Sequence, residues 1–183
     1  ALDNAAITYE VASGDDVISI ADKSEPAVTI LKAGTATVTV SAVKTSNVDG
    51  TFVTYTDTVN KASPTVEVVM PEGGGDDNTY GYTGTPLTFS ATVRGPGGVT
   101  QPATDGKLSY KYYTDNGGTC GGEIPDGQQP TNVGSYWVSA VYSGDGNYAA
   151  AESAPVKVTI SPAVLDVTVN NIYKGTYDGH SHD

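Results

Sequence analysis

Few residues of this chain belong to the types that catalyse reactions. Two acidic pairs, Asp15-Asp16 and Asp76-Asp77, lie beside glycines. Paired carboxylates can bind a hard cation or act as an acid–base couple. Neither pair is accompanied by a second acidic motif or a catalytic partner, so we interpret both pairs as solvated loop charges.

Histidine and cysteine are nearly absent. The only cysteine is Cys120, and no histidine precedes His180, so a Cys–His or Ser–His–Asp centre would need the end of the chain. His180 and His182 could share one face of a strand and hold a metal, but no third ligand is evident, and we interpret them as exposed. Glycosidase chemistry needs only carboxylates, yet it also needs a deep cleft. We therefore expect no enzyme, no cofactor and no metal site.

One segment could be mistaken for a calcium loop. Residues 142–148 read YSGDGNY, but the Glu that an EF-hand-type loop requires at position 12 is missing. We expect a turn instead, in which Gly144 and Gly146 adopt positive φ and Asp145 and Asn147 bond the local backbone.

Aromatic residues offer binding rather than catalysis. In segment 134–142, alternation places Tyr136 and Val138 on one face and Trp137 on the other. The apolar run, together with the family resemblance given below, puts Tyr136 and Val138 inside, so Trp137 is expected to point outward. In segment 107–114, Lys111 and Tyr113 share one face, and in an immunoglobulin sandwich the two segments would be neighbouring strands.

The sequence thus predicts a candidate contact surface of Trp137, Tyr113 and Lys111 for a sugar or a protein. The alternative, which the frequency of isolated exposed apolar residues favours, is that Trp137 packs under the loop 116–130 or against the preceding domain.

The composition limits the class of protein that carries these residues. The chain has 183 residues, with 24 Thr, 22 Val and 22 Gly but only 5 Leu, which favours strands over helices. Asp and Glu number 21 against 9 Lys and Arg, a net charge of −12, so nucleic acid is a poor partner. No apolar run is long enough to span a membrane, and a single cysteine forms no disulfide within the chain.

Alternation of apolar and polar residues predicts an all-β fold. Ten strands are expected, over residues 6–11, 17–20, 27–31, 36–43, 52–59, 65–70, 86–94, 107–114, 134–142 and 154–160. No segment has a capped helical period. The glycine-rich stretches 73–78, 95–98 and 116–122 are expected to lack packed secondary structure, and 116–130 to be mobile or a local insertion.

An internal repeat sets the expected domain boundaries. Residues 63–66 (SPTV) recur as 161–164 (SPAV), 98 positions later. This predicts three parts: 1–62, a short domain that lacks its first strand; 63–162, a complete domain of the usual immunoglobulin-like size; and 163–183, the opening of a third repeat. With no initiator Met, we expect the chain to be a piece of a longer polypeptide.

The first part resembles bacterial immunoglobulin-like repeats of group 2. Residues 7–9 (ITY), 17–20 (VISI) and 31–40 (LKAGTATVTV) are similar to that family's successive strands, and 55–59 (YTDTV) to its closing strand. The "kaGta" segment within 31–40 is the most specific of these matches.

The second part resembles repeats of group 3. Residues 130–140 (PTNVGSYWVSA), 142–148 and 156–160 (VKVTI) are similar to that family's last strands and turn, and 173–179 (YKGTYDG) to the opening of related repeats. The resemblance implies tandem immunoglobulin-like β-sandwiches in an extracellular protein of a bacterial cell surface.

Such repeats act as spacers or adhesion modules and are not catalytic, so we expect a spacer, stalk or adhesion segment whose partners are neighbouring immunoglobulin-like domains of the same chain. The alternative is a module that binds a glycan or a host surface protein through the exposed aromatic face. We expect neither nucleic-acid binding nor membrane insertion. An internal Lys–Asn isopeptide bond, as in some surface adhesins, is a further possibility that a mass lower by one ammonia would reveal.

Overall fold

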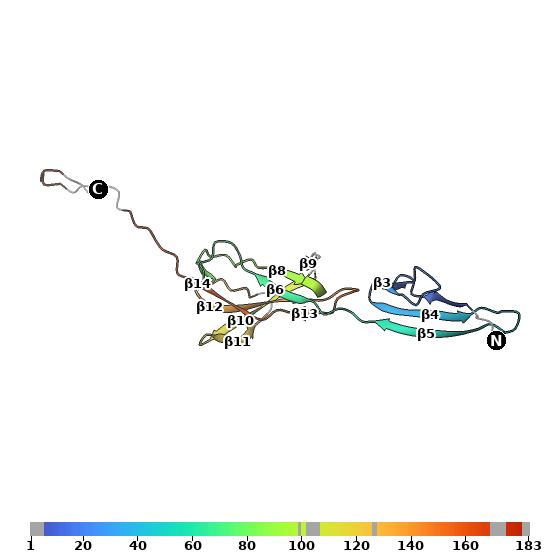
Figure 1. Cartoon of the computed structure of the whole chain (residues 1–183). Helices are drawn as coiled ribbons and strands as arrows, with labels where there is room; N and C mark the ends of the chain where they lie inside the picture. Colours follow the sequence, from blue (N-terminus) through green and yellow to red (C-terminus); the bar gives the residue numbers. More distant parts are fainter. Residues whose placement is uncertain (1–5, 99, 102–106, 126–127, 169–174, 181–183) are drawn as a thin grey trace.

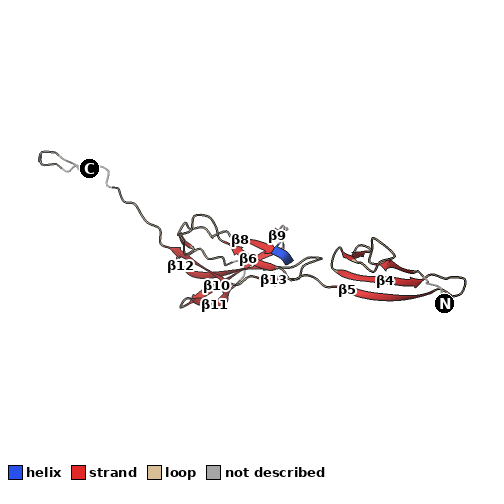
Figure 2. Cartoon of the chain, viewed as in Figure 1, coloured by secondary structure: helices blue, strands red, loops and turns tan. Residues whose placement is uncertain are grey.

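The computed structural model describes residues 6–98, 100–101, 107–125, 128–168 and 175–180. It is an all-β, β-sandwich-like structure, in which two groups of strands lie end to end (Figure 1). The only helical element described is a short 3₁₀ turn over Pro96–Gly98, coloured blue in Figure 2. Among the described residues there is no helix that is long and apolar enough to span a membrane.

The N-terminal group contains five strands: β1 (Ile7–Ser13), β2 (Ile18–Ser19), β3 (Thr29–Ile30), β4 (Gly34–Ala42) and β5 (Thr51–Val59). Strands β1, β4 and β5 form one antiparallel sheet in that order, and β2 pairs with β3. The apolar face of the sheet packs on Val17 and Ile18 near Ala36. Gly34 is required beside them, because a Cβ there would lie 2.7 Å from the Val17 side chain.

The C-terminal group contains nine strands: β6 (Thr65–Val69), β7 (Thr79–Gly81), β8 (Ser90–Arg94), β9 (Thr100–Gln101), β10 (Leu108–Asn116), β11 (Thr119–Ile124), β12 (Gly134–Tyr142), β13 (Ala151–Glu152) and β14 (Val156–Ser161). One sheet has the order β11-β10-β12-β14-β7, with β13 beside β12, and the other has the order β6-β8-β9. All pairs are antiparallel except β14 with β7.

The core of the C-terminal group lies between its two sheets. Val138, Ala140 and Val158 come from β12 and β14, and Val66 and Val93 from β6 and β8. The expected inward direction of Val138 is confirmed, since its side chain is fully buried, and the partly buried Tyr136 packs against the same core.

The ten expected strands are all present, although β2 and β3 are only two residues long. Four short strands were not expected: β7, β9, β11 and β13. The described residues after Ser161 contain no strand.

The prediction that the glycine-rich segment 116–122 lacks packed secondary structure was wrong. Residues Gly117 and Gly118 adopt positive φ and form the turn of a hairpin, and Cys120 to Gly122 then continue in β11. Gly121 lets the two strands approach closely, because a Cβ there would lie 2.6 Å from Thr114 Oγ1. Glycine is thus used here for close packing of backbones rather than for mobility.

Candidate contact surface

The outer face of the larger sheet carries the three residues predicted as a contact surface. Tyr113 on β10 lies directly opposite Trp137 on β12, and Lys111 lies opposite Ser139 two residues further along. On the other side of β12, Lys157 of β14 lies opposite Trp137. The strands expected to be neighbours therefore are neighbours, and the use of this face for binding stays a prediction.

Trp137 is half-buried and hydrogen-bonded. Its Nε1 donates to Asp115 Oδ1 at 2.8 Å, while Asp115 Oδ2 accepts the backbone N–H of Gly118 at 3.1 Å. Lys157 Nζ lies 3.5 Å from the same carboxylate. These contacts, that of Trp137 foremost, lower the pKa of Asp115. Asp115 thus ties Trp137 to the β10–β11 turn, at the start of the loop named in the alternative interpretation.

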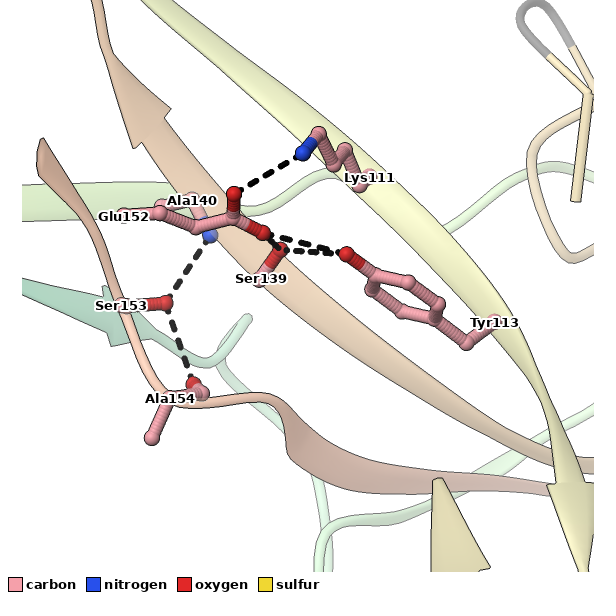
Figure 3. A network of polar contacts seen from close by, with 7 residues as sticks. All are labelled: Lys111, Tyr113, Ser139, Ala140, Glu152, Ser153 and Ala154. Carbon is pink, nitrogen blue, oxygen red and sulfur yellow. Dashed lines mark hydrogen bonds and ion pairs between the residues drawn. The ribbon is translucent and has the colours of Figure 1, made fainter. Parts of the chain in front are cut away.

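A second cluster is centred on Glu152 of β13 (Figure 3). Lys111 Nζ donates to Glu152 Oε2 at 2.8 Å, and Ser139 Oγ and Tyr113 OH donate to Oε1 at 2.6 and 3.1 Å. The bond from Lys111 is the main cause of the lowered pKa of Glu152, and it raises the pKa of Lys111 in turn. Burial is the main cause of the raised pKa of Tyr113.

The neighbouring Ser153 holds β13 against β12. Its Oγ accepts the backbone N–H of Ala140 at 3.0 Å and donates to the carbonyl of Ala154 at 3.1 Å (Figure 3). Ser153 and Ser139 are both buried. Sequence reasoning missed Glu152 and Ser153, because a two-residue strand has too few positions to show alternation.

The polar side chains of this face are therefore hydrogen-bonded largely to one another. Among the described residues, no buried side-chain nitrogen or oxygen lacks a hydrogen-bond partner, and no cluster of His, Cys, Asp and Glu could hold a metal. Lys111 is paired with Glu152 at a partly exposed site, whereas an isopeptide bond needs a buried lysine. The arrangement is one that stiffens a sheet.

The remaining candidate residues lie apart from this face. Asp16 pairs with Lys32, and Asp76 and Asp77 are exposed in a loop. Cys120 is exposed on β11. His180 is also exposed, while His182 lies outside the described residues.

The turn 142–148 has a role that the sequence only partly predicted. Gly144 adopts a φ of 81°, and Asp145 Oδ1 accepts the backbone N–H groups of Asn147 and Tyr148, each at 2.8 Å. These two bonds lower the pKa of Asp145. The predictions for Gly144 and Asp145 are confirmed, whereas Gly146 is not among the positive-φ residues.

The prediction that the Asn147 side chain bonds the local backbone was wrong, because this side chain reaches the N-terminal group instead. Its Oδ1 accepts the backbone N–H of Ala33 at 3.0 Å. Its carbonyl accepts the N–H of Ala62 at 2.8 Å, and the Ala62 carbonyl accepts the N–H of Ala149 at 2.9 Å. Ala62 and Tyr148 form a parallel β-bridge at the same place.

Apolar side chains from both groups surround this junction. Tyr148 lies over Gly95, where a Cβ would be 2.8 Å from the tyrosine hydroxyl. A shallow groove between the two groups is lined by Leu31, Val59 and Pro96 together with Asn147 and Tyr148.

Comparison with known proteins does not indicate a function, so the functional proposal is based on the contacts described above. Neither a scan of protein-family models nor a search of curated proteins finds a match for this chain.

Proposed function

We propose that the chain is a non-catalytic segment of a bacterial cell-surface protein, in which tandem immunoglobulin-like sandwiches act as a spacer, stalk or adhesion module. The observation that carries this proposal is the hydrogen-bonded junction around Asn147, which joins the two strand groups end to end (Figure 1).

The sheet order supports the immunoglobulin-like part of the proposal. Strands β11, β10, β12 and β14 follow one another in the order that the C′, C, F and G strands have in a variable-type sandwich. A second sheet, β6-β8, packs across the core from them. The three repeats proposed from the sequence are 1–62, 63–162 and 163–183, and their resemblance to bacterial immunoglobulin-like repeats points the same way.

The junction is suited to holding a fixed angle. The bond between Ala33 and Asn147 joins the two strand groups, and the two bonds of Ala62 fix the linker against the turn. Each hydrogen bond of this kind contributes roughly 0.5–1.5 kcal/mol. Pro64 lies two residues after Ala62, and proline restricts both its own φ and the preceding residue. A stiff junction lets successive domains keep their direction, which is what a spacer requires.

The charge fits an extended protein exposed to solvent. A net charge of −12 on 183 residues supports solubility and opposes binding to nucleic acid. We propose neighbouring immunoglobulin-like domains of the same protein as its partners, outside the bacterial cell.

The alternative function is binding of a glycan or a host surface protein through Trp137, Tyr113 and Lys111. It receives less support because the indole N–H, the tyrosine hydroxyl and the ammonium group are already bonded within the sheet. A ligand would have to displace these partners or bind only the apolar surface of the rings.

One pair of measurements separates the two functions. For a spacer, small-angle scattering of the purified chain gives an elongated particle, and the chain binds nothing on a glycan array or in host-protein extracts. Specific binding that is lost in Trp137→Ala and kept in Tyr82→Ala, an exposed tyrosine off this face, would replace the spacer by the alternative.

A further inference from the structure

Strand β6 carries the chain away from the junction with the N-terminal group. Near its start, Val66 shares a core cluster with Tyr142, the last residue of β12 and the first of the turn 142–148. Just beyond its end, Met70 packs against the other core cluster, as does Tyr136 near the start of β12. Strand β6 therefore runs from the junction end of the C-terminal group toward the opposite end (Figure 1).

Strand β14 leaves the C-terminal group at that opposite end. Antiparallel pairing places Ile160 opposite Gly134, the first residue of β12, and Val156 opposite Val138. The chain therefore enters the group through β6 at one end and leaves it through β14 at the other. Tension between the two flanking segments pulls each of these strands along its own length.

Strand β7 links the two terminal strands. The chain reaches it from β6 through a single loop, and β7 then pairs in parallel with β14 over Thr79–Gly81. A backbone bond lies at each end of this pair. The carbonyl of Asn78 accepts the N–H of Thr159 at 3.1 Å, and the carbonyl of Ser161 accepts the N–H of Tyr82 at 2.8 Å.

Two side chains add cross-links between the same segments. Ser161 Oγ donates to the carbonyl of Tyr80 at 3.2 Å, and Asn78 Nδ2 donates to the carbonyl of Lys157 at 3.3 Å. Tyr80 and Ile160 lie opposite one another in the pair, and both side chains are buried. The pair is thus bonded along its whole length and anchored in the core.

Tension along the molecule loads this pair in shear. Strand β6 is held by its own five pairs with β8, and force that frees β6 passes directly to β7. It then pulls β7 from its N-terminal end and β14 from its C-terminal end, in opposite directions along two parallel strands. Because the bonds between paired strands run across the strand direction, they must break together in shear, whereas a force across the strands breaks them one at a time.

We propose that the β7–β14 pair is a mechanical clamp, which keeps the C-terminal group folded while the chain is stretched between its neighbours. While the clamp holds, the β10–β11 hairpin at the other edge of the sheet lies outside the load path. A spacer has only to keep a distance, so resistance to tension is a function beyond the one proposed above. Its use to a cell rests on the proposed stalk, but the clamp itself is a property of this fold.

Single-molecule force spectroscopy in two directions tests the clamp, with Cys120→Ser removing the native thiol. Handles on cysteines introduced at Thr58 and Tyr177, both exposed, pull the C-terminal group along its length. Handles at Val133, the exposed residue before β12, and at Tyr177 pull β14 away from the start of β12 and across the strands. We expect a higher unfolding force along the length than across it, and equal forces would overturn the proposal.

Two variants separate the clamp from ordinary stability. Tyr82→Pro removes the N–H that bonds the carbonyl of Ser161. Forced unfolding is governed by the unfolding rate, and loss of this bond should raise that rate at constant force along the length about ten-fold. The control Gly121→Ala strains the β10–β11 hairpin, and it should lower stability in urea but leave the rate under force unchanged.

The results of the variants also decide the proposal. A rate under force that Tyr82→Pro leaves unchanged, or that Gly121→Ala raises as much, would contradict the clamp. If Tyr82→Pro fails to fold, the comparison of the two pulling directions still decides, because it leaves the clamp intact. Failure of the clamp would leave the elongated particle expected in small-angle scattering untouched, so it is distinct from failure of the proposed spacer.

Discussion

At the scale of single residues, the outer face of the large sheet illustrates what alternation can and cannot predict. The period-2 pattern placed Trp137, Tyr113 and Lys111 on one face, because side-chain direction in a strand follows sequence position. It could not predict that Glu152 and Asp115 hold them, because those contacts join residues distant in sequence.

The Glu152 cluster should make stability depend on pH. The pKa of Glu152 is lowered from its ordinary 4.5 in the folded protein, mainly by Lys111. Its stabilising contribution is therefore present above that value and is lost as the pH falls through the lowered folded-state pKa. Glu152→Gln should show a shallower loss of the free energy of unfolding below about pH 4.5.

Urea denaturation at a series of pH values checks this expectation. Asp76→Asn removes an exposed loop carboxylate and should keep the pH dependence of the unmodified chain. If the free energy of unfolding of Glu152→Gln depends on pH as steeply as that of the unmodified chain, the cluster does not contribute to the pH dependence of stability.

Asp115 should control the exposure of Trp137. In Asp115→Ala the indole loses its acceptor and the β10–β11 turn loses the bond to Gly118, so quenching of the fluorescence by acrylamide should increase. Trp137 is the only tryptophan, which makes the signal unambiguous. Equal quenching in Asp115→Ala and in the unmodified chain would contradict this role.

At the scale of elements, long alternating strands could be predicted from sequence and short or glycine-rich ones could not. The bounds of β12 were predicted without error, because a run rich in aromatic and β-branched residues lies between Gly134 and Tyr142. Strand β11 was missed, because its Gly121 allows a close approach to Thr114. The sequence pattern of a mobile loop and that of a tightly packed hairpin are the same in this case.

A pair of glycine substitutions tests this explanation of β11. Gly121→Ala puts a Cβ 2.6 Å from Thr114 Oγ1 and 2.9 Å from its carbonyl oxygen, so the hairpin must shift at a cost of about 1–3 kcal/mol. Gly122→Ala meets no atom within 4 Å and should change stability by less than about 0.5 kcal/mol. Chemical denaturation followed by the fluorescence of Trp137 measures both, and equal effects would refute the close approach.

At the scale of the whole molecule, the junction determines whether the chain is a rod or two tethered bodies. The turn 142–148 was predicted as a turn, but its contact with Ala33 and Ala62 depends on two parts of the chain more than 80 residues apart. Sequence periodicity carries no information on such contacts. The proposed spacer function depends on this junction more than on any other part of the structure.

The most direct test is the distribution of distances between spin labels on the two strand groups. Cysteines introduced at Thr58 and Ser109, both exposed, would carry the labels after Cys120→Ser removes the native thiol. We predict a single narrow distribution that broadens in Asn147→Ala, where the bond to Ala33 is lost, and that stays narrow in the control Asn132→Ala. A broad distribution in the chain with Asn147 intact would contradict the fixed junction and with it the proposed spacer.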